Sequence, residues 1–233
     1  CCGDTGSVFK TYDAGSNWYQ LYTGSHTALQ SVAFYTFRSG CVAGDSGTIL
    51  LTTDGGDTWS KRNTGTLHHL HGICFPAAGA GYAVGDWGTV LKSTDGGAVW
   101  FPLTSGTTRY LYGIHFIDPL TGYVAGSSGT VRKTTDGGAT WTDISPGVTT
   151  DLYAVHFTDT DHGIATGNNG LLLRTVNGGQ SWQPIATSTY NTLRSISFSQ
   201  SLNGYIAGTG GCILSTTDGG ASWASSFAPT AKD

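Results

Sequence analysis

The chain has 233 residues, of which 36 are glycine and only 11% are charged, and its formal net charge is −4. All 15 acidic residues are aspartate, and glutamate and methionine are absent, so the composition argues against long helices and favours short strands joined by tight turns. The 11 basic residues form no run, which argues against a nucleic-acid partner, and no apolar stretch reaches the ~18 residues of a membrane span.

The five cysteines show no Cys-x-x-Cys pair and no histidine at zinc-finger spacing. We therefore predict no structural metal and no cofactor. A mature lipoprotein would begin with a cysteine such as Cys1, but the repeat described next places Cys1 inside a strand. The absence of methionine indicates a processed chain or a piece of one. One disulfide remains an alternative, and the sequence cannot assign its pair.

Tryptophan recurs every 41 residues without insertion or deletion. The same register carries leucine at the start, and phenylalanine at the sixth position, of a strand-like segment. An unbroken period of this length is typical of propellers and other repeat proteins. The repeat predicts a single domain over residues 1–233, built from the units 1–28, 29–69, 70–110, 111–151, 152–192 and 193–233.

One unit, residues 111–151, resolves into four expected strands at 111–116, 123–126, 130–134 and 139–143. Four short strands per 41 residues, with no helical stretch between them, predict an all-β fold: a β-propeller of four-stranded antiparallel blades. The first unit aligns only from the end of its second strand. The sequence therefore leaves open a ring of six blades with an incomplete first blade or a larger ring.

A recurrent turn joins the third and fourth strands, as in Thr52-Thr-Asp54-Gly-Gly-Asp-Thr-Trp59. Its aspartate accepts hydrogen bonds from its own turn, its glycines supply positive φ angles, and its tryptophan covers the hairpin. The fifth copy has Asn177, which keeps the acceptor oxygen without the charge, so we interpret the motif as structural. The motif residues are Asp13, Trp18, Asp54, Trp59, Asp95, Trp100, Asp136, Trp141, Asn177, Trp182, Asp218 and Trp223.

This turn is the Asp-box (BNR) hairpin. Together with Leu-x-x-Ile-x-Phe and Gly-Tyr-x-x-Gly-x-x-Gly, it makes the whole chain resemble the photosystem II assembly/stability factor family. The resemblance implies a seven-bladed propeller that binds a protein and carries no catalysis. It also implies a basic patch for the partner, and here the arginines are dispersed, which puts the photosynthetic role in doubt.

Sialidases and other glycosidases also carry Asp boxes, so an enzyme is the alternative. Glycoside hydrolysis needs two carboxylates facing each other across a sugar, and this chain has no glutamate. Outside the boxes, the acidic residues in phase are Asp4, Asp45 and Asp86, and later units have Ser, Asn or Thr there. Because all these residues cap turns, we predict no enzyme and no catalytic residues.

Two groups of histidines could bind a metal. His68, His69 and His71 lie within four residues, but no acidic residue is adjacent to them in the sequence, and we interpret them as polar loop residues. His115 and His156 lie one repeat apart on the first strand, and we expect them to pack between blades.

Propellers usually bind their partners at the mouth of the channel, on the face opposite the Asp boxes. Tyrosine, tryptophan and arginine dominate protein interfaces, and they gather in the loops expected there. Trp87 is the main outlier, since other units have Thr, Ser, Asn or Gly at its position. The candidate binding residues are Trp87, Arg109, Tyr110, Tyr112, Tyr153, Tyr190, Arg194, His68 and His69, with Asp151 and Asn191 beside them.

Three functions therefore remain open. The first is a non-catalytic, secreted or periplasmic scaffold that binds proteins, within a larger complex or by self-assembly. The second is a propeller that binds or cleaves carbohydrate, with a glycan as partner. The third is a structural subunit of an extracellular assembly, suggested by the low charge and the richness in Gly, Ser and Thr. A propeller fold cannot choose among them.

Overall fold

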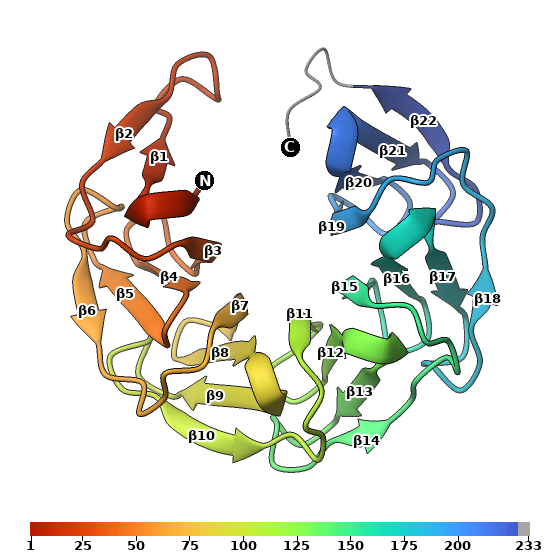
Figure 1. Cartoon of the computed structure of the whole chain (residues 1–233), viewed down its shortest axis with the longest axis horizontal. Coiled ribbons are helices and arrows are strands. Elements are labelled where there is room, and N and C mark those ends of the chain that lie inside the picture. The colour runs from red at the N-terminus through yellow and green to blue at the C-terminus, as the bar shows by residue number, and fades with distance from the viewer. Residues whose placement is uncertain (228–233) are drawn as a thin grey trace. The chain divides into compact units, whose positions relative to one another are not determined.

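The computed structural model describes residues 1–227, which form 22 β-strands and several short 3-10 turns but no α-helix (Figure 1). The strands make five four-stranded antiparallel sheets and one two-stranded sheet. The all-β prediction is therefore confirmed. No helix within residues 1–227 has the length and hydropathy needed to cross a membrane. The chain divides into two compact units: unit 1 is Cys1–Leu111 with Gly138–Thr140, and unit 2 is Tyr112–Gly137 with the chain from Trp141 onward.

Unit 1 contains the two-stranded sheet and two complete blades. The strands of the small sheet are β1 (Val8–Lys10) and β2 (Tyr19–Leu21), and a bridge joins Cys2 to Val8. The strands of the second blade are β3 (Leu29–Phe34), β4 (Gly40–Gly44), β5 (Thr48–Thr52) and β6 (Ser60–Arg62). Those of the third are β7 (Leu70–Ala77), β8 (Ala80–Gly85), β9 (Thr89–Ser93) and β10 (Phe101–Thr104).

Unit 2 contains three further blades of the same strand order. The fourth blade has β11 (Leu111–Phe116), β12 (Gly122–Gly126), β13 (Val131–Thr134) and β14 (Thr142–Asp143). The fifth has β15 (Leu152–Phe157), β16 (Gly163–Gly167), β17 (Leu172–Thr175) and β18 (Gln183–Pro184). The sixth has β19 (Leu193–Phe198), β20 (Gly204–Gly208), β21 (Cys212–Thr216) and β22 (Ala224–Phe227).

The strands expected in the fourth blade can be compared directly with β11 to β14. The first matches, and the next two agree within one residue. The fourth was expected at 139–143, but β14 spans only Thr142–Asp143, so that prediction is wrong for residues 139–141. The reason lies in the box turn: in the other copies its aspartate or asparagine binds the backbone N–H group at the position equivalent to Thr140, which a sheet ladder would otherwise use.

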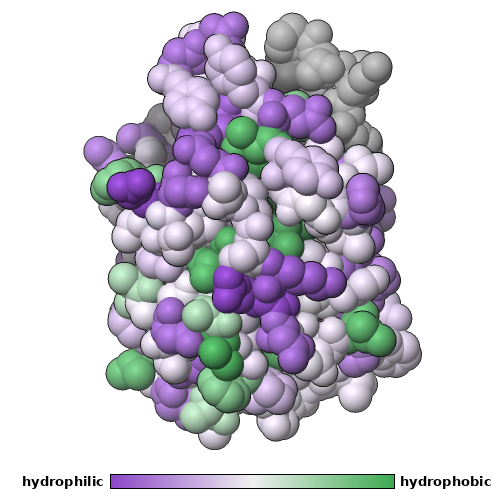
Figure 2. Space-filling model, turned by 90° about the vertical axis from the view of Figure 1, so that its left-hand side faces the viewer, coloured by the Kyte–Doolittle hydropathy of each residue, from purple (hydrophilic) through white to green (hydrophobic). Residues whose placement is uncertain are grey.

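The second to fifth blades bury both faces of their second strands. Every residue of β4 and β5 is buried, and apolar side chains of this blade pack against Leu70 and Ile73 of the next. In unit 2 the Tyr123 ring stacks on Phe157 of the following blade, with ring centroids 3.5 Å apart and planes 4° from parallel. Burial of apolar area between sheets is therefore the main stabilising contribution within each unit. On the face shown in Figure 2, apolar side chains form separate patches between polar ones.

The antiparallel strand order gives each blade two functionally different ends. One end, here called the mouth end, carries the turn between the second and third strands and the loop that leaves the fourth strand. The other end, the box end, carries the Asp-box turn and the loop between the first and second strands. Variable residues of the mouth end and repeated residues of the box end therefore lie at opposite ends of a blade.

A glycine allows close contact between the two mouth-end segments of a blade. Gly47 has φ +66°, and a Cβ atom there would overlap the carbonyl oxygen of Thr66 in the loop after β6. The Thr64 hydroxyl donates a buried hydrogen bond of 2.8 Å to the carbonyl oxygen of Gly47. Gly6, Gly88, Gly129 and Gly170 make the same close approach in their own blades. Only glycine satisfies both the φ angle and the space.

We predict that Gly47→Ala destabilises the protein by more than about 3 kcal/mol, because it adds a steric overlap to a strained φ angle. Gly65→Ala is the matched control, since Gly65 has φ +68° with no atom near the added Cβ. It should cost only about 1–2 kcal/mol. Urea unfolding measures both values, and equal losses would contradict the close-approach argument.

Candidate functional site

The Asp-box turns satisfy their carboxylates internally. Asp54 Oδ1 accepts hydrogen bonds from the Thr58 backbone N–H (2.9 Å) and the Thr52 hydroxyl (2.8 Å), and Oδ2 accepts one from the Thr58 hydroxyl. These bonds, above all that from the Thr58 hydroxyl, hold the pKa of Asp54 well below its usual value. Asp13, Asp95 and Asp218 also accept hydrogen bonds from their own turns, which lower their pKa values; for Asp95 the largest cause is the bond from the Val99 backbone N–H. The box carboxylates therefore serve their own turns.

Asn177 builds the same turn with an amide. Its Oδ1 accepts from the Ser181 backbone N–H (3.0 Å) and the Thr175 hydroxyl (2.9 Å), while Nδ2 donates to the Ser181 hydroxyl (2.9 Å). The turn thus needs an acceptor oxygen more than it needs a charge.

The tryptophans that follow the box turns differ in burial: Trp100 and Trp141 are buried, whereas Trp18 is 51% exposed.

We predict that Asn177→Asp raises the melting temperature at pH 7 and that Asp54→Asn lowers it, because hydrogen bonds to a carboxylate are stronger than those to an amide. The pKa of a box carboxylate is depressed, so its contribution is present above the unfolded value of about 4 and is lost as the pH falls below it. Thermal unfolding at pH 7 and pH 3 tests both variants. An equal effect at the two pH values would contradict this explanation.

Trp87 occupies the second position of the mouth-end turn Asp86–Gly88 of the third blade. Its backbone lies in the left-handed region (φ 56°, ψ 32°), where a bulky side chain is an outlier. The side chain is 60% exposed, and its ring meets the edge of Tyr110, with centroids 5.4 Å apart and planes at 82°. The structure therefore brings together two aromatic residues that the sequence singled out separately.

The mouth-end histidines of unit 1 have acidic partners, which the sequence did not indicate. His69 Nδ1 lies 3.2 Å from Asp45 Oδ1, and His71 Nε2 lies 2.7 Å from Asp86 Oδ1. His68 Nδ1 lies 2.8 Å from the Thr89 hydroxyl. The expectation that these histidines have no acidic neighbours is wrong. The turns that carry Asp45 and Asp86 lie beside the chain that enters β7, although they are distant from it in the sequence.

In unit 2 a second aromatic group follows the innermost strands. Tyr112 and Tyr153 have ring centroids 5.1 Å apart, and the Arg194 guanidinium lies 5.2 Å from the centre of the Tyr153 ring. The pairing register shifts at Tyr153 and at Arg194, so each is the extra residue of a β-bulge, which redirects its side chain. The sequence analysis missed these bulges. A break in alternation after the first leucine of each strand was their only signal.

Three further predicted residues have positions and contacts of their own. Tyr190 is 92% exposed in the loop that leads to β19. Arg109 is exposed, and its backbone N–H donates to the Thr107 hydroxyl at 3.1 Å. Asp151 accepts a hydrogen bond of 2.9 Å from the Ser128 backbone N–H and so supports a neighbouring turn.

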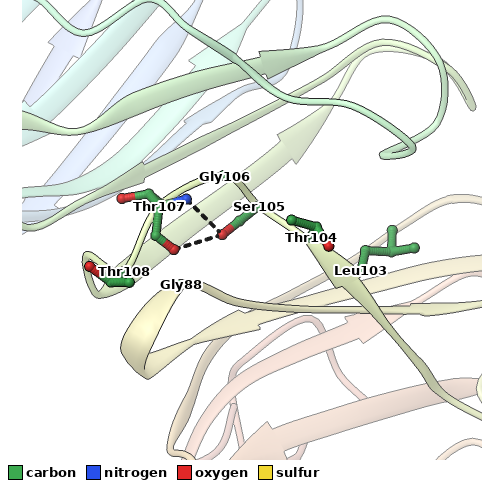
Figure 3. Close-up of a pocket in the computed structure, with 7 residues that line it drawn as sticks. All are labelled: Gly88, Leu103, Thr104, Ser105, Gly106, Thr107 and Thr108. Atoms are coloured by element: carbon green, nitrogen blue, oxygen red, sulfur yellow. Dashed lines mark hydrogen bonds between the residues drawn. The ribbon is translucent and has the colours of Figure 1, made fainter.

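An open cavity of about 560 Å³ lies at the mouth end of the third blade (Figure 3). It is lined by Gly88, next to Trp87, and by Leu103–Thr108, the chain that leads to Tyr110. The Ser105 hydroxyl donates to the Thr107 carbonyl oxygen (3.1 Å) and accepts from the Thr107 N–H (3.4 Å). The lining thus consists of short hydroxyl side chains, one leucine and backbone, without a charged side chain. The sequence analysis missed this cavity.

His115 and His156 stack between adjacent blades of unit 2, as expected from their phase. Their ring centroids are 4.0 Å apart, and His156 stacks in turn on Phe198 at 5.2 Å. His115 Nδ1 accepts a hydrogen bond of 3.2 Å from the Phe157 N–H. Burial lowers the pKa of His115 to about 3, with a smaller contribution from His156, and burial lowers the pKa of His156 to about 4.

We predict that this pair makes unit 2 sensitive to acid. A histidine with a depressed folded-state pKa stabilises the protein above its unfolded value of about 6.5, and this stability is lost as the pH falls toward 4. Between pH 7 and pH 5 the free energy of unfolding should fall by about 2–4 kcal/mol. His156→Phe keeps a flat ring beside His115 and Phe198 and should remove about half of this loss. An unchanged pH dependence in the variant would contradict the assignment.

Within residues 1–227 no group of three or more His, Cys and Asp side chains could hold a metal ion. All five cysteines lie in this part of the chain, and all are free thiols. Cys41 is buried, and burial raises the pKa of its thiol to about 12. The candidate residues at the mouth ends of the blades are aromatic, hydroxyl-bearing and charged.

The model of the photosynthesis system II assembly factor YCF48 family matches residues 10–108 and 143–228. Comparison with curated proteins finds no match. Among solved structures, a YCF48 protein bound to a D1 peptide is similar with a TM-score of 0.76 and 18% identity, over 96% of this chain and 75% of that one. YCF48 from Cyanidioschyzon merolae gives a TM-score of 0.73 and 17% identity, over 97% and 79% of the two chains.

A glycosidase is also similar in structure. The GH74 enzyme of Niastella koreensis gives a TM-score of 0.80 and 18% identity over 98% of this chain, but the chain spans only 43% of that enzyme. Likeness at this level of identity concerns the fold. All three similar structures support the assignment of a β-propeller built from four-stranded blades, as the repeat predicted.

Proposed function

The chain belongs to the photosynthesis system II assembly factor YCF48 family, and we propose that it is a non-catalytic propeller that binds a segment of another protein through the mouth ends of its blades. A member of this family has been solved with a D1 peptide bound, which supports a protein partner. The family's fold accounts for the rigid blades. The side chains at the mouth ends of the blades determine which protein segment binds.

One position of the mouth-end turn supports the proposal, because its backbone conformation is constant while its side chain varies. The second residue of the mouth-end turn has a φ between 53° and 64° in all six units. Its side chains nevertheless range from glycine to tryptophan: Thr5, Ser46, Trp87, Ser128, Asn169 and Gly210. A backbone that stays constant while its side chain varies leaves that side chain available for binding, and loops on a rigid scaffold are where binding usually resides.

Two groups of side chains offer contact area of the kind found in protein interfaces. Unit 1 presents Trp87 and Tyr110, and unit 2 presents Tyr112, Tyr153 and Arg194. Aromatic and arginine side chains bury large areas at a small entropic cost and dominate binding hot spots. The members of each group contact one another, which reduces the ordering that binding requires.

The alternative is a carbohydrate-binding or glycosidase function, which the structural likeness to a GH74 enzyme favours. Against catalysis, the chain has no glutamate, and the mouth-end aspartates Asp45 and Asp86 are paired with histidines. A glycosidase would need a carboxylic acid and a second carboxylate on opposite sides of a sugar. We also propose an extracellular or periplasmic location, for which the low charge and the richness in Gly, Ser and Thr are the support.

We predict that immobilised protein binds the D1 peptide and that replacing Tyr112 and Tyr153 with serine weakens this binding at least tenfold, because both rings lie at the mouth ends of unit 2. Leu120→Ser is the matched control, since Leu120 is 57% exposed in a box-end loop. Surface plasmon resonance measures the affinities. No binding, or the same loss in the control, would contradict a mouth-end protein site, and hydrolysis of xyloglucan would contradict the absence of catalysis.

A further inference from the structure

We propose that the mouth end of the third blade is a binding site for an extended, proline-containing peptide segment. The site consists of the ring corner formed by Trp87 and Tyr110 and of the neighbouring cavity along Leu103–Thr108. The proposal rests on the proposed function, because it names the chemical class of the segment that one mouth end recognises.

The first argument is the conformation of Trp87. Serine, asparagine and glycine occupy the same turn position in other blades, and asparagine and glycine adopt its φ angle at little cost. A tryptophan there is strained, and its ring is 60% exposed, with Tyr110 as its aromatic neighbour. Strain at an exposed aromatic residue points to a role in binding.

The second argument is the rigidity of the turn that carries Trp87. His71 holds Asp86 at 2.7 Å, and the Thr89 hydroxyl donates a 2.6 Å hydrogen bond to the Asp86 carbonyl oxygen. Gly88 packs against the Thr107 carbonyl oxygen so closely that a Cβ atom would overlap it. The ring is therefore presented on a fixed base, which reduces the entropy lost on binding.

The third argument is the shape of the aromatic pair. With ring planes at 82° and centroids 5.4 Å apart, Trp87 and Tyr110 form two walls of a corner rather than one broad platform. A proline ring is compact, apolar and without an N–H donor, so it fits such a corner. Proline-containing segments also adopt an extended polyproline II helix before they bind, and aromatic-lined grooves recognise that helix.

The fourth argument is the lining of the adjacent cavity, whose volume of about 560 Å³ lies in the range of ligand pockets. It contains no charged side chain. The Ser105 hydroxyl is already bonded to Thr107, and the Thr107 hydroxyl accepts the Arg109 N–H. The lining therefore offers hydroxyl groups and backbone without charge, which fits an uncharged segment (Figure 3).

The test uses fluorescein-labelled decaproline as the probe and fluorescence anisotropy with the whole chain. We expect saturable binding that Trp87→Ser and Tyr110→Thr each weaken at least tenfold, since each variant removes one wall of the corner. Trp87→Ser introduces the residue that Ser46 and Ser128 place at the same φ angle, so its melting temperature should stay close to that of the unchanged protein. Loss of binding in that variant would then not reflect unfolding.

Ser128→Trp, made in the Trp87→Ser background, is the matched control. It places a tryptophan in the same turn of a blade where Asp151 stands in place of Tyr110, and it should not restore binding. The proposal is overturned if decaproline does not bind, if Trp87→Ser changes its affinity less than twofold, or if a Gly-Ser decapeptide or a xyloglucan oligosaccharide binds this corner equally well. Should the D1 peptide still depend on mouth-end residues in that case, the proposed function stands and only the proline assignment fails.

Discussion

The mouth end of each of the first five blades depends on one close approach, that of a turn glycine to the carbonyl oxygen of the loop that leaves the fourth strand. The glycine has a positive φ angle and no room for a Cβ atom, as at Gly47 and Gly88. Threonine hydroxyls such as that of Thr64 strengthen the contact. Because this contact uses backbone atoms and glycine, it fixes the turn while leaving the preceding side chain unconstrained. The variable residue of the turn is therefore presented on a rigid base.

Most of the fold followed from the sequence, because the 41-residue period repeats the residues that the backbone requires. The boundaries of β11 were predicted from its leucine and phenylalanine, and the structural role of the box followed from Asn177. The start of β14 was wrong, because box hydrogen bonds compete with the sheet ladder. Such competition between local and ladder hydrogen bonds is not visible in hydrophobic periodicity.

The candidate site was predictable residue by residue but not as a set of contacts. Trp87 was recognised as an outlier and Tyr110 as a candidate binding residue, but their pairing depends on a spatial proximity that a separation of 23 positions in the sequence conceals. The partners of His69 and His71 were missed for the same reason. The bulges at Tyr153 and Arg194 were missed because an extra residue disturbs alternation only locally. The position of a residue within the 41-residue repeat predicts its place on a blade, whereas contacts between loops are seen only in the three-dimensional structure.

Position 87 carries a tryptophan that serves binding, although its backbone conformation favours glycine or asparagine. The most direct measurement is therefore a comparison of all twenty residues at this position, with the free energy of unfolding and the affinity for decaproline determined for each. The account predicts an inverse relation: glycine and asparagine give the most stable proteins, while tryptophan gives the tightest binding. If tryptophan were instead among the most stabilising residues and the affinity were the same for all twenty, the central claim would be contradicted.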